Sequence, residues 1–137
     1  MNSERIFALL LLAAGSSAMA EWLPVSAGND GTQTTYTGGK AITVSGHIVN
    51  MSSLQDFRTP QRIEESPEPM LYKSVEKQFA FDCANKQFRM TSFAYYAGNM
   101  GIGRVVLGDS HTGSSGWQPV NDDPMDKILF ARACTKK

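Results

Sequence analysis

Hydrophobic and polar residues alternate along much of the chain, and the clearest example is the segment 71–83. The apolar positions of one parity in LYKSVEKQFAFDC are Leu71, Val75, Phe79, Phe81 and Cys83. Such alternation is typical of a strand with one buried face, because successive side chains of a strand point to opposite sides of the sheet. We therefore predict a strand that runs from a half-exposed start into the core and ends at a tight turn over 84–86.

Other segments show the same alternation over shorter lengths. Residues 41–51 alternate, and their parity changes next to Gly46, which predicts a β-bulge or a local twist there. Residues 21–27 contain a proline that suits an edge strand. Residues 87–97 begin with alternation and then carry bulky residues of both parities, and residues 104–107 form a short β-branched run. Together these segments predict five or six strands.

Three segments break the alternation and predict turns and loops. Residues 56–70, DFRTPQRIEESPEPM, contain three prolines, three glutamates and two arginines. This composition cannot bury a face and predicts a surface loop between the two halves of one domain. Residues 28–40 hold two turn clusters around a short Thr/Tyr run, and residues 109–116 form a polar loop.

The end of the chain changes to a helical pattern. Asp123 and Pro124 suit the N-cap and the first helical position, and an apolar stripe begins at Met125. Cys134 falls outside this stripe, so we predict that the helix ends within 131–133 and that Cys134 follows in an extended piece. The complete pattern predicts an α+β fold, in which an antiparallel sheet of about six strands carries one C-terminal helix.

The first 20 residues predict a signal peptide rather than part of the fold. An apolar run of ten residues, 6–15, precedes Ala18 and Ala20 at the small-residue positions of a cleavage site. An uncleaved membrane anchor is the alternative, but a bilayer span needs about 20 apolar residues. We therefore expect residues 21–137 to form a single exported domain, periplasmic or extracellular at the cell surface. No cysteine lies near the cleavage site, so no lipid anchor is expected.

Charge and hydropathy exclude some partners. The chain carries 13 basic and 13 acidic residues, and this balance gives no electrostatic reason to expect a nucleic acid or an anionic membrane surface. No second long apolar run occurs in the sequence, so we expect no membrane span in residues 21–137.

Cys83 and Cys134 are the two cysteines of the chain. An even pair in an exported protein predicts a disulfide, which would clamp the helix to the sheet. The alternative is a metal or redox pair. The sequence has no CxxC motif, and its imidazoles are His47 and His111. We therefore expect no metal and no cofactor.

The segment YYAGNMGIGRVVL, residues 95–107, raises the question of a nucleotide site because Gly98, Gly101 and Gly103 lie close together. A phosphate-binding glycine loop leads from a strand into a helix, so that backbone N–H groups and the helix dipole converge on the anion. Here a β-branched run follows the glycines. We therefore predict a hairpin turn, in which the glycines supply positive φ and allow close backbone contact.

The remaining polar clusters do not predict catalysis. Asp109, Ser110 and His111 are adjacent on a loop, whereas a catalytic triad needs a nucleophile, a base and an orienting group that are held together. The carboxylate pairs at 64–65 and 122–123 fall in a predicted loop and a helix cap, where they are expected to be exposed to water. We therefore expect that the protein is not an enzyme.

The segment LYKSVEKQFAFDCANKQFRMTSFAYYAGNMGIGRVV carries a resemblance to a known family. With Trp22, Trp117 and the closing Cys134, it resembles the surface-adhesin protein E family of small exported Gram-negative proteins. The resemblance implies an antiparallel sheet of about six strands with a disulfide-tied C-terminal helix. It also implies binding of host matrix or plasma proteins, as in the member that gives the family its name. This chain departs from the family pattern at YTGGKAI and IVNMSS.

These observations predict a non-catalytic, adhesin-like binding protein that contacts host or extracellular proteins. The alternative is a periplasmic inhibitor or assembly accessory that binds another protein of the bacterial envelope. Tyr95, Tyr96 and Arg104 flank the glycine turn, and tyrosine and arginine are enriched at interface hot spots, so they are the candidate binding residues. Alternatively, both sheet faces are covered here and the tyrosines belong to the core. An unpaired strand beside them would also allow a homodimer by strand addition.

Overall fold

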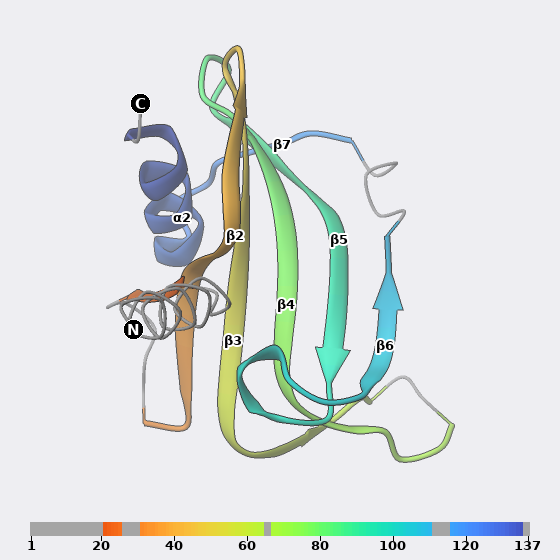
Figure 1. Ribbon diagram of the computed structural model, residues 1–137. Coiled ribbons are helices and arrows are strands. Elements are labelled where there is room, and N and C mark those ends of the chain that lie inside the picture. Colours follow the sequence, from red (N-terminus) through yellow and green to blue (C-terminus); the bar gives the residue numbers. More distant parts are fainter. Residues whose placement is uncertain (1–20, 26–30, 65–66, 111–115, 136–137) are drawn as a thin grey trace, which may run out of the picture.

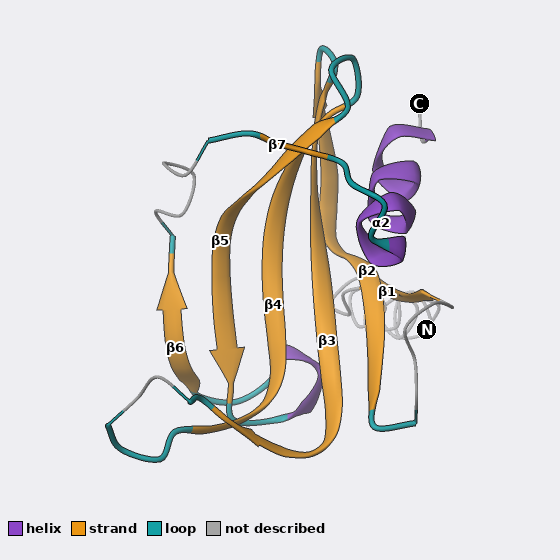
Figure 2. Cartoon of the chain, turned by 180° about the vertical axis from the view of Figure 1, so that it is seen from behind, coloured by secondary structure: helices purple, strands orange, loops and turns teal. Residues whose placement is uncertain are grey.

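The computed structural model describes residues 21–25, 31–64, 67–110 and 116–135, and the predicted signal peptide lies outside these ranges. Within them, seven strands form one antiparallel sheet, and a helix packs on one of its faces (Figures 1 and 2). The strands are β1 (Glu21–Val25), β2 (Gln33–Ser45), β3 (Ile48–Arg62), β4 (Leu71–Asp82), β5 (Gln87–Tyr96), β6 (Val105–Asp109) and β7 (Gln118–Pro119). The helices are the short 3₁₀ helix η1 (Asn99–Gly101) and α2 (Pro124–Thr135). The α+β fold is confirmed, and the strand count rises from about six to seven.

Six of the strands are hydrogen-bonded in sequence order from β1 to β6, so the sheet is a meander. β7 pairs with the first residues of β5, and β6 pairs with the last residues of β5, so both strands share one edge of β5. No helix in the described part of the chain is long and apolar enough to cross a bilayer.

The predicted surface loop over 56–70 is wrong in its first half, because β3 continues as a strand to Arg62. The ladder between β3 and β4 shifts register between Asp56 and Gln61, and this irregularity contains Pro60. A bulge leaves residues outside the ladder, so a proline and exposed polar residues fit there without breaking the sheet. The connection that remains between β3 and β4 covers residues 63–70.

The turn and the bulge of the β2–β3 region occur at each other's predicted positions. Ser45 pairs with Ile48, so Gly46 and His47 form a two-residue hairpin turn, and the predicted bulge at Gly46 is wrong. Gly46 has a φ of +61°, which glycine adopts without steric cost. The ladder between β2 and β3 is irregular instead between Gly38 and Thr43, at the end of a segment for which the sequence predicts a turn. Local sequence signals a break in regular pairing here, but its type depends on the partner strand.

The predicted tight turn after β4 is confirmed, and Asp82 organises it. One carboxylate oxygen of Asp82 accepts hydrogen bonds from the backbone N–H groups of Ala84 (3.1 Å) and Asn85 (3.0 Å). The other accepts from the side-chain amide of Asn85 at 2.9 Å. These bonds, with the Asn85 side chain contributing most, hold the pKa of Asp82 below its usual range, and the His47 imidazole adds to the effect.

We expect this turn to make stability sensitive to acid. Because the folded-state pKa of Asp82 is depressed, its contribution is fully present above the unfolded value of about 3.9 and is lost as pH falls through the folded value. Melting curves recorded between about pH 6 and about pH 2 should therefore show a smaller loss of Tm in Asp82→Asn than in the wild type. Asp122→Asn, at an exposed carboxylate, is the control and should follow the wild type. An Asp82→Asn curve parallel to that of the wild type would contradict the assignment.

Helix α2 begins where the sequence predicts and ends later. Asp123 Oδ1 accepts hydrogen bonds from the N–H groups of Met125 (2.8 Å) and Asp126 (3.2 Å), which confirms Asp123 as the N-cap. The predicted end within 131–133 is wrong, because α2 runs to Thr135 and includes Cys134. Side chains four residues apart share a helix face, and Phe130 and Cys134 widen the apolar stripe, so Cys134 reaches the core from within the helix.

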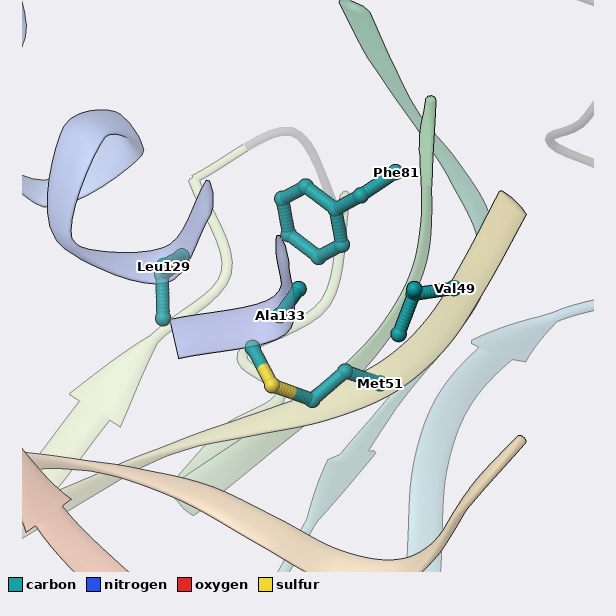
Figure 3. Close-up of a cluster of buried hydrophobic side chains, with 5 residues drawn as sticks. All are labelled: Val49, Met51, Phe81, Leu129 and Ala133. Carbon is teal, nitrogen blue, oxygen red and sulfur yellow. The ribbon is translucent and has the colours of Figure 1, made fainter. Parts of the chain in front are cut away.

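The core lies between α2 and the sheet. Figure 3 shows Leu129 and Ala133 of α2 facing Val49 and Met51 of β3 and Phe81 of β4, and all five side chains are buried. Cys83, which follows β4, forms a disulfide with Cys134, across a sequence separation of 51 residues. The predicted clamp between helix and sheet is therefore confirmed. We call the face of the sheet that carries α2 the inner face and the opposite one the outer face.

Candidate functional site

The glycine segment forms a hairpin loop, as predicted. β5 and β6 pair as antiparallel strands, and the Ala97 N–H donates to the Arg104 carbonyl at 2.9 Å. Gly101 and Gly103 have φ values of +68° and +97°, so they supply the positive φ that the turn needs. At Gly98 the requirement is close approach, since a Cβ there would lie 2.5 Å from the Ile102 carbonyl oxygen.

The loop over 97–104 is held against the outer face of the sheet by two side chains. Ser74 Oγ donates to the Gly98 carbonyl at 2.7 Å and accepts from the Gly101 N–H at 2.9 Å. Asp56 Oδ1 accepts from the Met100 N–H at 2.7 Å and from the side-chain amide of Asn99 at 3.1 Å. Ser74 is completely buried. The loop is therefore a fixed surface and not a free hairpin tip.

Neither Asp56 nor Ser74 is singled out by the sequence. Asp56 opens the segment 56–70, whose composition predicts a surface loop, and Ser74 occupies a polar position of an alternating strand. Their partners in the loop lie 44 and 27 residues away in sequence, for Met100 and Gly101 respectively. No local pattern signals such pairs.

Replacement of Asp56 should loosen the hairpin loop. Because an ionised carboxylate makes the bonds to Met100 and Asn99, we expect Asp56→Ala to lower the free energy of unfolding by about 2 kcal/mol. Urea denaturation measures the loss. Asp56→Asn keeps an acceptor oxygen and should lose less, whereas equal losses in the two variants would argue against these hydrogen bonds as the cause.

Tyr95, the first predicted binding residue, lies on the inner face. Its ring contacts the rings of Tyr72 and Phe93 in edge-on geometry, with centroids at 4.6 Å and 5.6 Å. Tyr72 in turn contacts Phe57 at 5.8 Å. These four half-buried side chains form the aromatic row, which crosses β3, β4 and β5. Burial, and to a lesser degree the Tyr95 hydroxyl, raises the pKa of Tyr72.

Tyr96 lies on the outer face, because adjacent residues of a strand point to opposite sides. It lines a groove of about 350 Å³ together with Glu76, Ala94 and Gly108, which we call the outer groove. Burial raises the pKa of Tyr96, and the Glu76 carboxylate adds to this effect. Tyr96 is half-buried and Glu76 is 9% exposed.

Arg104 is exposed at the point where the loop enters β6. Its carbonyl accepts a hydrogen bond from the Ala97 N–H, next to the last paired residues of the two strands, Tyr96 and Val105. The three predicted residues are thus close along the hairpin but occupy different surfaces: Tyr95 the inner face, Tyr96 the outer groove and Arg104 the loop.

His111 lies outside the described residues. Within those that are described, no group of three or more His, Cys, Asp and Glu side chains could hold a metal ion.

Comparisons with known proteins give one family and one fold. The family model described as surface-adhesin protein E matches residues 22–135. The structure of crystal form II of Haemophilus influenzae protein E is similar over 83% of this chain and 87% of that chain, with a TM-score of 0.60 and 16% identity. Another protein E structure from this organism covers 85% of this chain and 88% of its own, with a TM-score of 0.55 and 16% identity.

A third similar structure is protein E from non-typeable Haemophilus influenzae. It has a TM-score of 0.54 and 16% identity, over 83% of this chain and 72% of that one. None of the curated protein sequences matches the chain. At this level of identity, the similarity between the structures establishes the fold.

Proposed function

Since this chain belongs to the surface-adhesin protein E family, we propose that it is a non-catalytic, exported, adhesin-like protein that contacts host or extracellular proteins. The observation that carries the proposal is the family match, which extends over residues 22–135 and so over nearly all of the predicted domain 21–137. The fold shared with protein E supports it.

The surface around the β5–β6 hairpin supports binding. The aromatic row presents half-buried rings, and Arg104 is exposed nearby on the chain. Tyrosine and arginine contribute strongly to interfaces because they combine a large contact area with hydrogen-bonding groups. The hydrogen bonds from Asp56 and Ser74 fix the loop and thereby reduce the entropy that binding would cost.

Protease treatment of intact cells tests whether the protein is displayed on the surface. An adhesin should be removed from intact cells, while a periplasmic marker protein survives. The purified protein should also bind members of a panel of immobilised extracellular-matrix and plasma proteins. Survival of the protein in intact cells, with no binding to the panel, would favour a periplasmic inhibitor or assembly accessory instead.

Three alanine variants test the binding residues. Tyr95→Ala, Tyr96→Ala or Arg104→Ala should each weaken binding to a panel member by about 2 kcal/mol if the residue is a hot spot. Arg62→Ala, at an exposed arginine of β3, is the matched control. The melting temperature of each variant separates the alternatives. If the tyrosine variants unfold at much lower temperature and binding is unchanged, the tyrosines belong to the core and the assignment fails.

Two further parts of the proposal concern the processed protein. We propose that residues 1–20 are removed and that residues 21–137 act as one domain, so N-terminal sequencing of the exported protein should begin at Glu21.

We also propose that β6 can pair with β6 of a second copy. It is a short strand whose Val105 and Leu107 are 50% and 39% exposed. Sedimentation equilibrium should then show a dimer, and a monomer at all concentrations would exclude this pairing.

A further inference from the structure

The outer face of the sheet carries a row of neutral polar side chains that crosses four strands. Thr43 of β2 is paired with Asn50 of β3. Further along β3, Ser52 is paired with Gln78 of β4, which is paired in turn with Ser92 of β5. Residues paired directly in antiparallel strands have side chains on the same face. Asn50 and Ser52 alternate with core residues of β3, so these five residues, which we call the polar row, lie on the outer face.

The polar row borders two hollows that meet at Gln78. One is the outer groove of about 350 Å³, which Gln78 and Ser92 line. The other has a volume of about 230 Å³, and Asn50, Ser52 and Gln78 line it. Because Gln78 lines both, the two hollows form one trough from β3 to β6, which we call the outer trough. Three strand spacings amount to roughly 14 Å, which is the length of a short oligosaccharide.

The outer trough offers hydrogen-bonding groups and little charge. Among the described residues that line the hollow over β3, none is charged. In the outer groove, Glu76 is 9% exposed and already interacts within the chain, and Asp109 pairs with Phe93, so its side chain lies on the inner face. No described residue shares a side-chain hydrogen bond with the carboxamide of Gln78 or the hydroxyl of Ser92. Such groups suit an uncharged ligand that carries many hydroxyl groups.

The floor of the outer groove is small and apolar. Ala94 of β5 and Gly108 of β6 are paired in register, and Tyr96 lines the groove beside them. Two small residues side by side leave a hollow in a face that larger side chains fill elsewhere. Val105 lies next to this floor, since its Cγ1 would be 3.5 Å from a Cβ placed at Gly108. The floor therefore suits a methyl group, and the tyrosine ring suits the C–H face of a sugar.

We propose that the outer trough binds a neutral oligosaccharide that contains N-acetylhexosamine and is carried by an extracellular glycoprotein. The acetamido methyl group would lie on Ala94 and Gly108, and the sugar ring would lie against Tyr96. Gln78 and Ser92 would form hydrogen bonds with the amide and hydroxyl groups of the sugar. Neighbouring sugar units would continue along the rest of the polar row. That the oligosaccharide belongs to an extracellular glycoprotein rests on the proposed function.

A matched pair of trisaccharides tests the outer trough without knowledge of the glycoprotein. The probe is triacetylchitotriose, and the matched probe is cellotriose, which has the same linkage and carries hydroxyl groups in place of the acetamido groups. In ¹⁵N NMR spectra of the mature protein, triacetylchitotriose should shift the amide signals of Gln78, Ser92, Ala94 and Gly108. We expect saturation with a Kd of the order of 1 mM. Cellotriose should bind about tenfold more weakly, because it has no methyl group for the apolar floor.

Two variants link the binding to the lining of the trough. Ala94→Val fills the hollow with a residue that suits a strand, so it should weaken binding of triacetylchitotriose by about tenfold. Gln78→Ala removes the half-buried carboxamide at the centre of the trough and should weaken binding about fivefold. It keeps the test decisive if Ala94→Val does not fold. Gln118→Ala, at an exposed glutamine of β7, is the matched control and should leave the affinity unchanged.

The outcomes separate this inference from the proposed function. Equal affinity for the two trisaccharides, shifts away from the trough, or unchanged affinity in both trough variants would overturn the inference. Binding to purified peptidoglycan, with no binding to an immobilised glycoprotein, would overturn the choice of an extracellular glycoprotein as the source. If triacetylchitotriose binds as expected but the protein is not displayed on cells, the trough remains a sugar site and the adhesin-like function fails. If the protein is displayed and binds host proteins but ignores triacetylchitotriose, the reverse holds.

Discussion

Removal of the Cys83–Cys134 disulfide should cost the domain about 4 kcal/mol of stability. The disulfide closes a loop with a sequence separation of 51 residues, and the chain-entropy relation gives about this value for a loop of that length. The main effect is on the unfolded chain, which gains conformational freedom when the bond is absent. In the folded state, α2 also loses its covalent attachment to the end of β4.

The variant Cys83→Ala/Cys134→Ala measures this effect without a free thiol. Its free energy of unfolding in urea should fall by about 4 kcal/mol, and its Tm by roughly 15 °C for a domain of this size. Reduced wild-type protein is the control and should behave like the double variant. A double variant within about 1 kcal/mol of the oxidised wild type would show that the disulfide adds little to stability.

Replacement of Phe81 by alanine should produce a loss of similar size in the core. Phe81 is 1% exposed, and its ring lies 5.8 Å from that of Phe79, 6.3 Å from that of Phe88 and 6.3 Å from that of Phe130 on α2. Phe81→Ala removes these contacts and leaves a cavity beneath the helix. For buried phenylalanines the expected cost is about 4 kcal/mol.

Phe81→Leu is the matched control, because it keeps an apolar side chain in the same place. It should lose no more than about 1.5 kcal/mol. Both variants are compared with the wild type by urea denaturation at one pH. If Phe81→Ala loses as little as Phe81→Leu, the contact between α2 and the sheet is not the main core of the domain.

The two losses should not add. Phe81 precedes Cys83 by two residues, and each holds α2 against β4, Phe81 through Phe130 and Cys83 through Cys134. Changes that share a partner element usually interact by about 0.5–3 kcal/mol. The triple variant Phe81→Ala/Cys83→Ala/Cys134→Ala lacks both attachments, so its loss of unfolding free energy should differ from the sum of the two separate losses by an amount in this range.

Several elements were predictable because their causes are local. The alternation in 71–83 predicted β4, since side-chain direction along a strand depends only on neighbouring residues. The cap at Asp123 predicted the start of α2, because its hydrogen bonds reach only two and three residues ahead. The disulfide was predictable because the sequence has two cysteines behind a predicted signal peptide. The hairpin conformation of the glycine loop was predictable because a β-branched strand, and not a helix, comes after the glycines.

The extent of β3 could not be read from its own residues. Three prolines in 56–70 are a true signal of irregularity, but whether the chain leaves the sheet or forms a bulge is decided by the partner strand β4. In the same way, the late end of α2 depends on what Phe130 and Cys134 pack against. The local sequence thus indicates where a strand or helix becomes irregular. Whether the chain then bulges, turns or continues depends on the element that it packs or pairs with.

The candidate surfaces were decided by the tertiary structure. The sequence indicated that Tyr95 and Tyr96 lie near a hairpin, and strand geometry put them on opposite faces. The fixing of the loop by Asp56 and Ser74 required β3 and β4 to bring these side chains beneath it. The outer groove exists because small residues of β5 and β6 fall in register beside Glu76. Register is set by the packing of whole strands, so none of these contacts leaves a local trace in the sequence.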